Sequence, residues 1–128
     1  MAVVYSQAVQ VSRMGDVLTA IGNAGKIKGY TAADVLVVTW TLPNPSGTVS
    51  NANPSVLTFD IDPDVEGTVA ATGTITKATV TTAADAVIVS GLTVGTGSEN
   101  IVMSSNVVGN VADTVTLQTA TITHNTAG

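Results

Sequence analysis

The sequence contains no cysteine and a single histidine, His124. Without cysteine there can be no disulfide, no Cys-type zinc site and no thiol nucleophile, and one histidine cannot form a histidine cluster. Charged residues make up only 10% of the chain, with four basic against nine acidic residues and a formal net charge of −5. Such a chain offers no basic surface to a phosphate backbone or an anionic membrane. We therefore expect neither nucleic acid nor membrane as a partner.

Long apolar runs are also missing. The richest one, residues 35–40, is interrupted by Thr39 and is much shorter than the roughly 20 residues that a membrane-spanning helix needs. The first ten residues contain no Lys or Arg and no long apolar segment, so they lack the features of a secretory signal. We expect synthesis in the cytoplasm.

The chain is rich instead in valine and threonine, which favour strands. Only residues 6–22 show helical periodicity, with Ser6 as the expected N-cap and Gly22 at the C-terminal end. The apolar residues of the expected inner face recur at spacings of three and four: Ala8, Val11, Met14, Leu18 and Ile21.

Beyond residue 25 the apolar period becomes two, which is typical of strands. About seven or eight short strands, separated by turn residues, predict a mainly β protein: an antiparallel β-sandwich or jelly-roll-like fold with one short N-terminal helix. Residues 43–54 contain two Asn-Pro pairs and are expected to form a loop. Strand alternation predicts these buried residues: Leu36, Val38, Trp40, Leu42, Leu57, Phe59 and Ile61. The whole chain, 1–128, is expected to be one domain, with an arm and helix over 1–25 and the β-sandwich over 26–128.

Three stretches resemble a family of small tailed-bacteriophage virion proteins known as capsid decoration or cement proteins. They are YSQAVQVSRMGDVLTAIGNAGKIKGY near the N-terminus, LTFDIDP followed by AATGTITKATV, and AVIVSGLTVG leading to the closing ATITH. The family more often has a Tyr-Asp-Gly turn where this chain has Tyr30, Thr31 and Ala32. The resemblance implies a β-sandwich that binds the outside of an icosahedral capsid without chemistry, with the major capsid protein of the same phage as partner.

An acidic cluster follows the central strand, with carboxylates at every second position: Asp60, Asp62, Asp64 and Glu66. Such oxygens could bind Ca²⁺, but the glycine and glutamate positions of an EF-hand loop are not met. The favoured interpretation is that these charges protect a strand edge from pairing with another chain. Cation binding stays open as the alternative.

Catalytic motifs are weak. His124 could nominally join Asp113 and a serine such as Ser90, yet no nucleophile elbow of the G-x-S-x-G type is present. The glycine-rich stretch from Gly95 to Ser98 precedes a strand-like segment and is expected to be a hairpin turn. We therefore expect a protein that is not an enzyme, with no catalytic residue, no cofactor and no bound metal.

Assembly contacts are expected at two places. The N-terminal arm of Ala2, Val3, Val4 and Tyr5 is apolar and too short to fold on itself, so it must pack on something larger. The loop containing Pro43, Pro45 and Pro54 has restricted freedom when unbound, which lowers the entropy cost of docking. We expect a homo-oligomer, preferably a trimer, on the capsid exterior after synthesis in the host cytoplasm. The alternatives are a phage tail, neck or head-fibre protein and, less favoured, a carbohydrate-binding or adhesion module.

Overall fold

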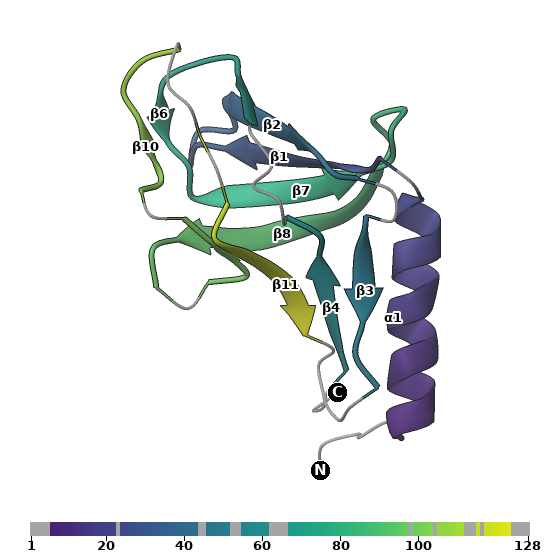
Figure 1. The fold of residues 1–128 in the computed structure, drawn as a ribbon. Helices are drawn as coiled ribbons and strands as arrows, with labels where there is room; N and C mark the ends of the chain where they lie inside the picture. The colour runs from purple at the N-terminus through teal and green to yellow at the C-terminus, as the bar shows by residue number, and fades with distance from the viewer. Residues whose placement is uncertain are drawn as a thin grey trace.

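One helix and a curled sheet form the domain (Figure 1). The computed structural model describes residues 6–22, 24–43, 46–51, 55–61, 67–97, 99–103, 105–111, 115 and 117–123. The helix is α1 (Gln7–Ile21). The strands are β1 (Lys26–Tyr30), β2 (Leu36–Thr41), β3 (Gly47–Val49), β4 (Val56–Phe59), β5 (Gly67–Val69), β6 (Gly73–Thr74), β7 (Lys77–Thr81), β8 (Val87–Gly95), β9 (Ile101–Val102), β10 (Val107–Val108) and β11 (Thr119–Thr123).

Helix α1 begins and ends at the residues that the sequence indicates. The Ser6 hydroxyl accepts a hydrogen bond from the Val9 amide at 3.4 Å, so it satisfies one of the free amides of the first turn. Gly22 has a φ of 75° and donates its amide to the Leu18 carbonyl at 3.0 Å. A positive φ at this position suits glycine, which has no Cβ to clash.

The helix lies beside β3 and β4 and is attached partly through polar groups (Figure 1). Gln10 is fully buried, and its Oε1 accepts from the Ser55 amide at 3.0 Å, just before β4. At the other end, the buried Ser46 hydroxyl donates to the Gly22 carbonyl at 2.7 Å and accepts from the Gly25 amide at 3.1 Å. These bonds place both ends of the helix against the β3 and β4 segment.

Among the described residues, nine strands form one mixed sheet in the order β3-β4-β11-β9-β8-β7-β1-β2-β5, and β10 pairs with β6 in a small second sheet. All pairs are antiparallel except β8 with β9, which run parallel. The expected mainly β fold with one N-terminal helix is confirmed. The segment from Gly95 to Ser98 was expected to be a hairpin turn, and this prediction is wrong, because the strands on either side of it are parallel.

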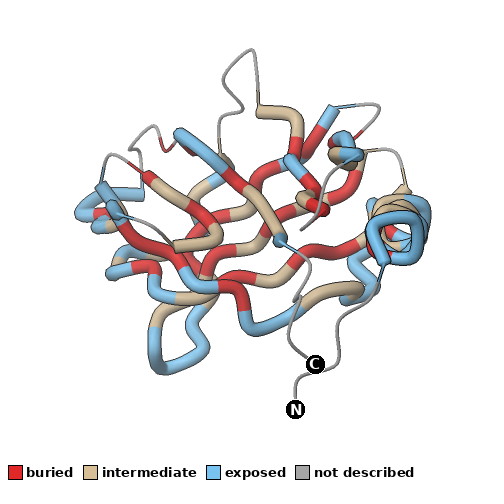
Figure 2. Tube along the Cα trace, turned by 90° about the horizontal axis from the view of Figure 1, so that it is seen from below, coloured by how far each residue is buried: buried red, intermediate tan, exposed pale blue. Residues whose placement is uncertain are grey.

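The core occupies the concave side of the curled sheet, and Figure 2 shows buried segments along the central strands and exposed ones on the turns. Trp40 is fully buried, and its indole Nε1 donates to the Val115 carbonyl at 3.0 Å. Of the seven residues predicted to be buried, Val38, Trp40, Leu42, Leu57 and Phe59 are buried. Leu36 and Ile61 are only half-buried.

A β-bulge explains the exception at Leu36. In the β1/β2 pair, Tyr30 lies opposite Leu36 and Gly29 opposite Val38, so Val37 is an extra residue in the ladder. The extra residue reverses the alternation, which places Leu36 beside Tyr30 and buries Val37 completely. Strict alternation with Val38 and Trp40 would place Val37 on the outer face, and the bulge is the reason that it is buried instead.

The expected loop over residues 43–54 is also only partly correct. It contains strand β3, which pairs with β4 along its whole length, Gly47 with Phe59 and Val49 with Leu57. Glycine at position 47 allows the strand to approach the Thr58 backbone closely. The Asn and Pro residues of this segment flank the strand instead of excluding it.

Candidate functional site

The predicted contact residues lie mostly outside the described residues. Ala2, Val3, Val4, Tyr5, Pro45 and Pro54 all fall there. Pro43 is described and exposed, and its carbonyl accepts from the Ala24 amide at 3.3 Å. Pro43 is therefore accessible to a partner at the end of β2.

The start of α1 offers an apolar surface where the arm joins the domain. Ala8 and Val9 are exposed in the first helical turn, and 43% of Val9 is accessible. Ala8 had been expected on the inner face, but the buried positions of the helix are Gln10, Met14 and Ile21. The buried face of the helix therefore begins at the polar Gln10 and not at Ala8.

Most of the acidic and catalytic candidates lie outside the described part of the chain. Asp62, Asp64, Glu66, Asp113 and His124 lie outside the described residues, whereas Asp60 is half-buried. In the described part of the chain, no three His, Cys, Asp or Glu side chains form a group that could hold a metal ion. Ser90 is described and exposed on β8.

Two hairpins of the sheet share the same turn, a feature that our sequence analysis missed. Residues 31–34 and 82–85 both read Thr-Ala-Ala-Asp, and the first connects β1 to β2 while the second connects β7 to β8. In each turn the threonine hydroxyl accepts from the amides two and four residues later, at 3.2 to 3.3 Å. Both aspartates adopt positive φ, 66° at Asp34 and 71° at Asp85. The repeated tetrapeptide was the available sequence signal.

The two hairpins are related by a local twofold axis perpendicular to the sheet. A shift of 51 positions, from Thr31 to Thr82, maps Lys26 on Lys77 and Tyr30 on Thr81. The β1/β7 ladder pairs Lys26 with Thr81 and Tyr30 with Lys77, so each pair exchanges with the other under this shift. The axis passes between Lys28 and Thr79, which lie opposite one another and are themselves related by the shift.

Ion pairs connect the two hairpins across this axis. Lys26, at the start of β1, bonds Asp85 of the second turn at 3.0 Å, and Lys77, at the start of β7, pairs with Asp34 of the first. Lys28 also bonds Asp85 at 3.0 Å. Three of the four basic residues of the chain therefore lie on one face of the sheet, each paired with a turn aspartate.

The two lysines affect the protonation of Asp85. Hydrogen bonds from Lys26 and then Lys28 hold the pKa of this carboxyl below its ordinary value of 3.8. Because the lowered pKa belongs to the folded state, its contribution to stability is present above the unfolded pKa and disappears as the pH falls through the folded one. More than half of the Asp85 side chain is exposed, so the contribution is screened by solvent.

A carboxyl ¹³C NMR titration tests this arrangement. The midpoint for Asp85 should lie below 3.8 and should rise in both Lys26→Gln and Lys28→Gln, because each change removes a cation that stabilises the carboxylate. Lys77→Gln is the matched control, since Lys77 pairs with Asp34, and it should leave the midpoint unchanged. A wild-type midpoint at or above 3.8 would contradict the observed geometry.

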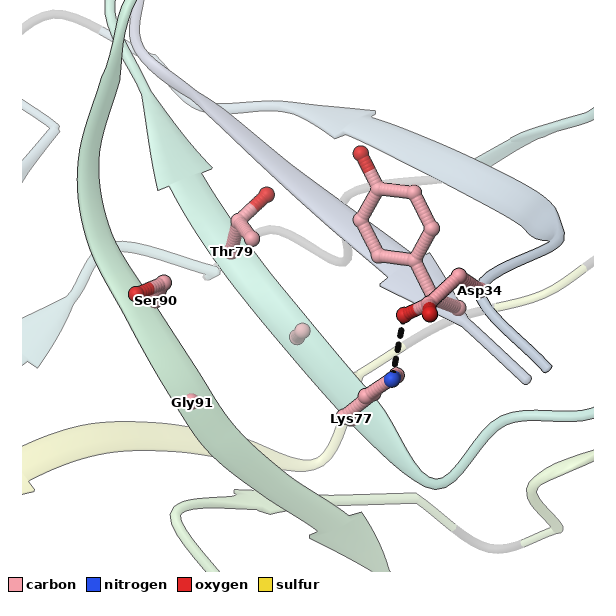
Figure 3. A pocket seen from close by; sticks show the side chains of 7 residues that line it. Asp34, Lys77, Thr79, Ser90 and Gly91 are labelled. Carbon is pink, nitrogen blue, oxygen red and sulfur yellow. Dashed lines mark ion pairs between the residues drawn. The ribbon is translucent and has the colours of Figure 1, made fainter. Parts of the chain in front are cut away.

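A pocket of about 340 Å³ lies on the same face, beside Asp34 (Figure 3). Its walls come from β1, β7, β8 and the first turn, and its lining includes Tyr30, Asp34, Lys77, Thr79, Ser90 and Gly91. The Lys77 and Asp34 ion pair closes one end, while Thr79 and Ser90 lie on neighbouring strands (Figure 3). The Oγ1 of Thr79 is buried and has no hydrogen-bond partner among the described residues.

No known protein family, curated protein or solved structure matches this chain. Within its described residues, no helix is long and apolar enough to cross a membrane.

Proposed function

We propose that this chain is a non-enzymatic virion structural protein that binds the outer surface of a phage capsid and stabilises contacts between capsomers. The proposed family, the capsid decoration proteins, is inferred from the sequence resemblance. That resemblance implies a β-rich domain. The mainly β fold with one N-terminal helix agrees with that implication.

The observation that carries the proposal is the uncovered apolar start of α1. Ala8 and Val9 are exposed in the first turn, Val9 to 43%, and Ser6 and Gln7 connect them to an arm whose residues 2–5 are all apolar or aromatic. An apolar segment of this kind is expected to pack against a larger partner. A cement protein would use it to add contact area across subunit boundaries, and binding only the assembled shell stabilises that shell by mass action.

The partner in this proposal is the major capsid protein of the same phage, and the protein itself is a homo-oligomer, with a trimer favoured. Particles purified from the encoding phage should contain the protein in stoichiometric ratio with the major capsid protein. Recovery in only a few copies per particle would instead support a tail, neck or head-fibre component. Light scattering of the free protein measures its oligomeric state.

Deletion of residues 2–5 should greatly reduce occupancy on purified heads while leaving the domain folded, because the described core is built from other segments. Val9→Ser should weaken binding by up to about tenfold, the equivalent of one buried valine side chain. Co-sedimentation with heads lacking the protein measures both effects.

Val107→Ser is the matched control. Val107 is 60% exposed but lies on β10, far from the start of α1 (Figure 1), so its substitution should leave binding unchanged. Unchanged occupancy after the arm deletion, or equal losses from both valine substitutions, would count against the start of α1 as the contact surface.

A further inference from the structure

On the face of the sheet that carries the ion pairs, the two hairpins differ at the position beside the local twofold axis. Lys28 and Thr79 occupy equivalent places beside the axis. Lys28 extends to Asp85, so that aspartate accepts from two lysines, Lys26 and Lys28. Its counterpart Asp34 is paired with Lys77, and Thr79 is too short to extend to it as a lysine would.

The pocket lies where a second lysine beside Asp34 would be expected from the other hairpin. It lies next to Thr79 and reaches Asp34 (Figure 3). In the other hairpin the equivalent position is held by Lys28, whose side chain extends to Asp85. The Tyr30 ring and the Gly91 backbone provide walls against which a methylene chain can pack. At the base, the unpartnered Thr79 hydroxyl is a polar group that can gain a partner by rotating about χ1.

We infer that this pocket binds a primary ammonium group on an alkyl chain, and specifically a lysine side chain of a docking protein. In the bound state the ammonium bonds the Asp34 carboxylate, as Lys28 bonds Asp85, and its methylenes lie between Tyr30 and Gly91. The second hairpin demonstrates that one turn aspartate accommodates two lysines at 3.0 Å each.

The occupant is assigned to a protein because the structural precedent is a lysine side chain carried on a backbone. The Asp34 side chain is 79% exposed, so a lysine carried on a peptide can approach it from solvent. The inference does not depend on whether the partner is a capsid, and its test uses no particle.

Titration of the ¹⁵N-labelled full chain with Nα-acetyl-lysine-N-methylamide tests the pocket by amide chemical shifts. Saturable shifts should appear at residues 34, 77–79 and 90–91. The Nε-acetylated form of the same compound lacks the positive charge and should cause none of them. Asp34→Asn should weaken binding by up to about fivefold, as expected for loss of one exposed ion pair. Thr79→Lys should abolish binding, because the new side chain would occupy the pocket and extend to Asp34 as Lys28 extends to Asp85.

Asp85→Asn is the matched control on the symmetry-related turn, and it should leave the affinity unchanged. Asparagine tolerates positive φ, so both Asp→Asn variants are expected to keep their turns, and dispersed amide spectra verify this. Equal shifts from the charged and neutral compounds, or equal losses in Asp34→Asn and Asp85→Asn, would overturn the inference. Tighter binding of n-butylamine than of the lysine derivative would overturn the assignment to a protein-borne lysine.

Discussion

Trp40→Ala should reduce the free energy of unfolding by about 3–5 kcal/mol, the usual cost of emptying a large aromatic site in a core. Trp40 is fully buried on β2, and its indole links that strand to Val115 on a segment 75 residues away in sequence. Removal of the ring leaves a cavity between the two segments. For a domain of this size we expect the melting temperature to fall by more than about 10 °C.

Trp40→Phe separates packing from the hydrogen bond. It keeps most of the ring volume and removes only the indole donor, and the Val115 carbonyl still accepts from the Gly67 amide at 2.8 Å. This variant should therefore lose much less stability than Trp40→Ala in chemical denaturation. A Trp40→Ala protein as stable as wild type would show that the indole is not a core element.

Gly47→Ala should be the most damaging of the small-volume substitutions. A Cβ at this position would lie 2.5 Å from the Thr58 carbonyl oxygen and 3.1 Å from the Phe59 Cα. These are backbone atoms of β4, which is held on its other side by β11, so the neighbour cannot simply move away. We expect a loss of about 1–3 kcal/mol, as for overpacking.

Gly15→Ala is the control for the same chemical change. Gly15 lies in the interior of α1, and apart from the adjacent backbone of the helix itself no atom lies within 4 Å of an added Cβ. Alanine should stabilise the helix there by about 0.5–1 kcal/mol. In denaturant titrations, the free energy of unfolding should fall in Gly47→Ala and rise in Gly15→Ala. An unchanged value in Gly47→Ala would mean that β3 and β4 are not packed this closely.

The proposed function and the inferred pocket can be contradicted separately, because their experiments probe different surfaces. Loss of head binding in the arm deletion concerns the start of α1, whereas amine shifts concern a pocket on β1, β7 and β8. A protein that binds heads without binding the lysine derivative would retain the proposed function and lose the inferred pocket. The reverse result would keep an amine-binding β domain whose protein partner is not a capsid.

Local sequence patterns determined the elements of this protein. Periods of 3.6 and 2 located α1 and the main strands, Ser6 and Gly22 marked the helix ends, and alternation identified Trp40 and Phe59 as core residues. These features are predictable because each depends on residues a few positions apart. The pattern could not reveal the bulge at Val37 or the burial of Gln10, since both depend on a partner strand or a distant amide.

Only the tertiary structure decided how the repeated hairpins meet. The two Thr-Ala-Ala-Asp turns are visible in the sequence, but their joining around a twofold axis requires β1 to pair with β7, about 50 residues later. That pairing brings Lys77 to Asp34 and Lys26 to Asp85. Because Thr79 is shorter than Lys28, the pairing also leaves a pocket beside Thr79 and Asp34. Strand pairing is a long-range choice made by whole-core packing, so no local pattern specifies it.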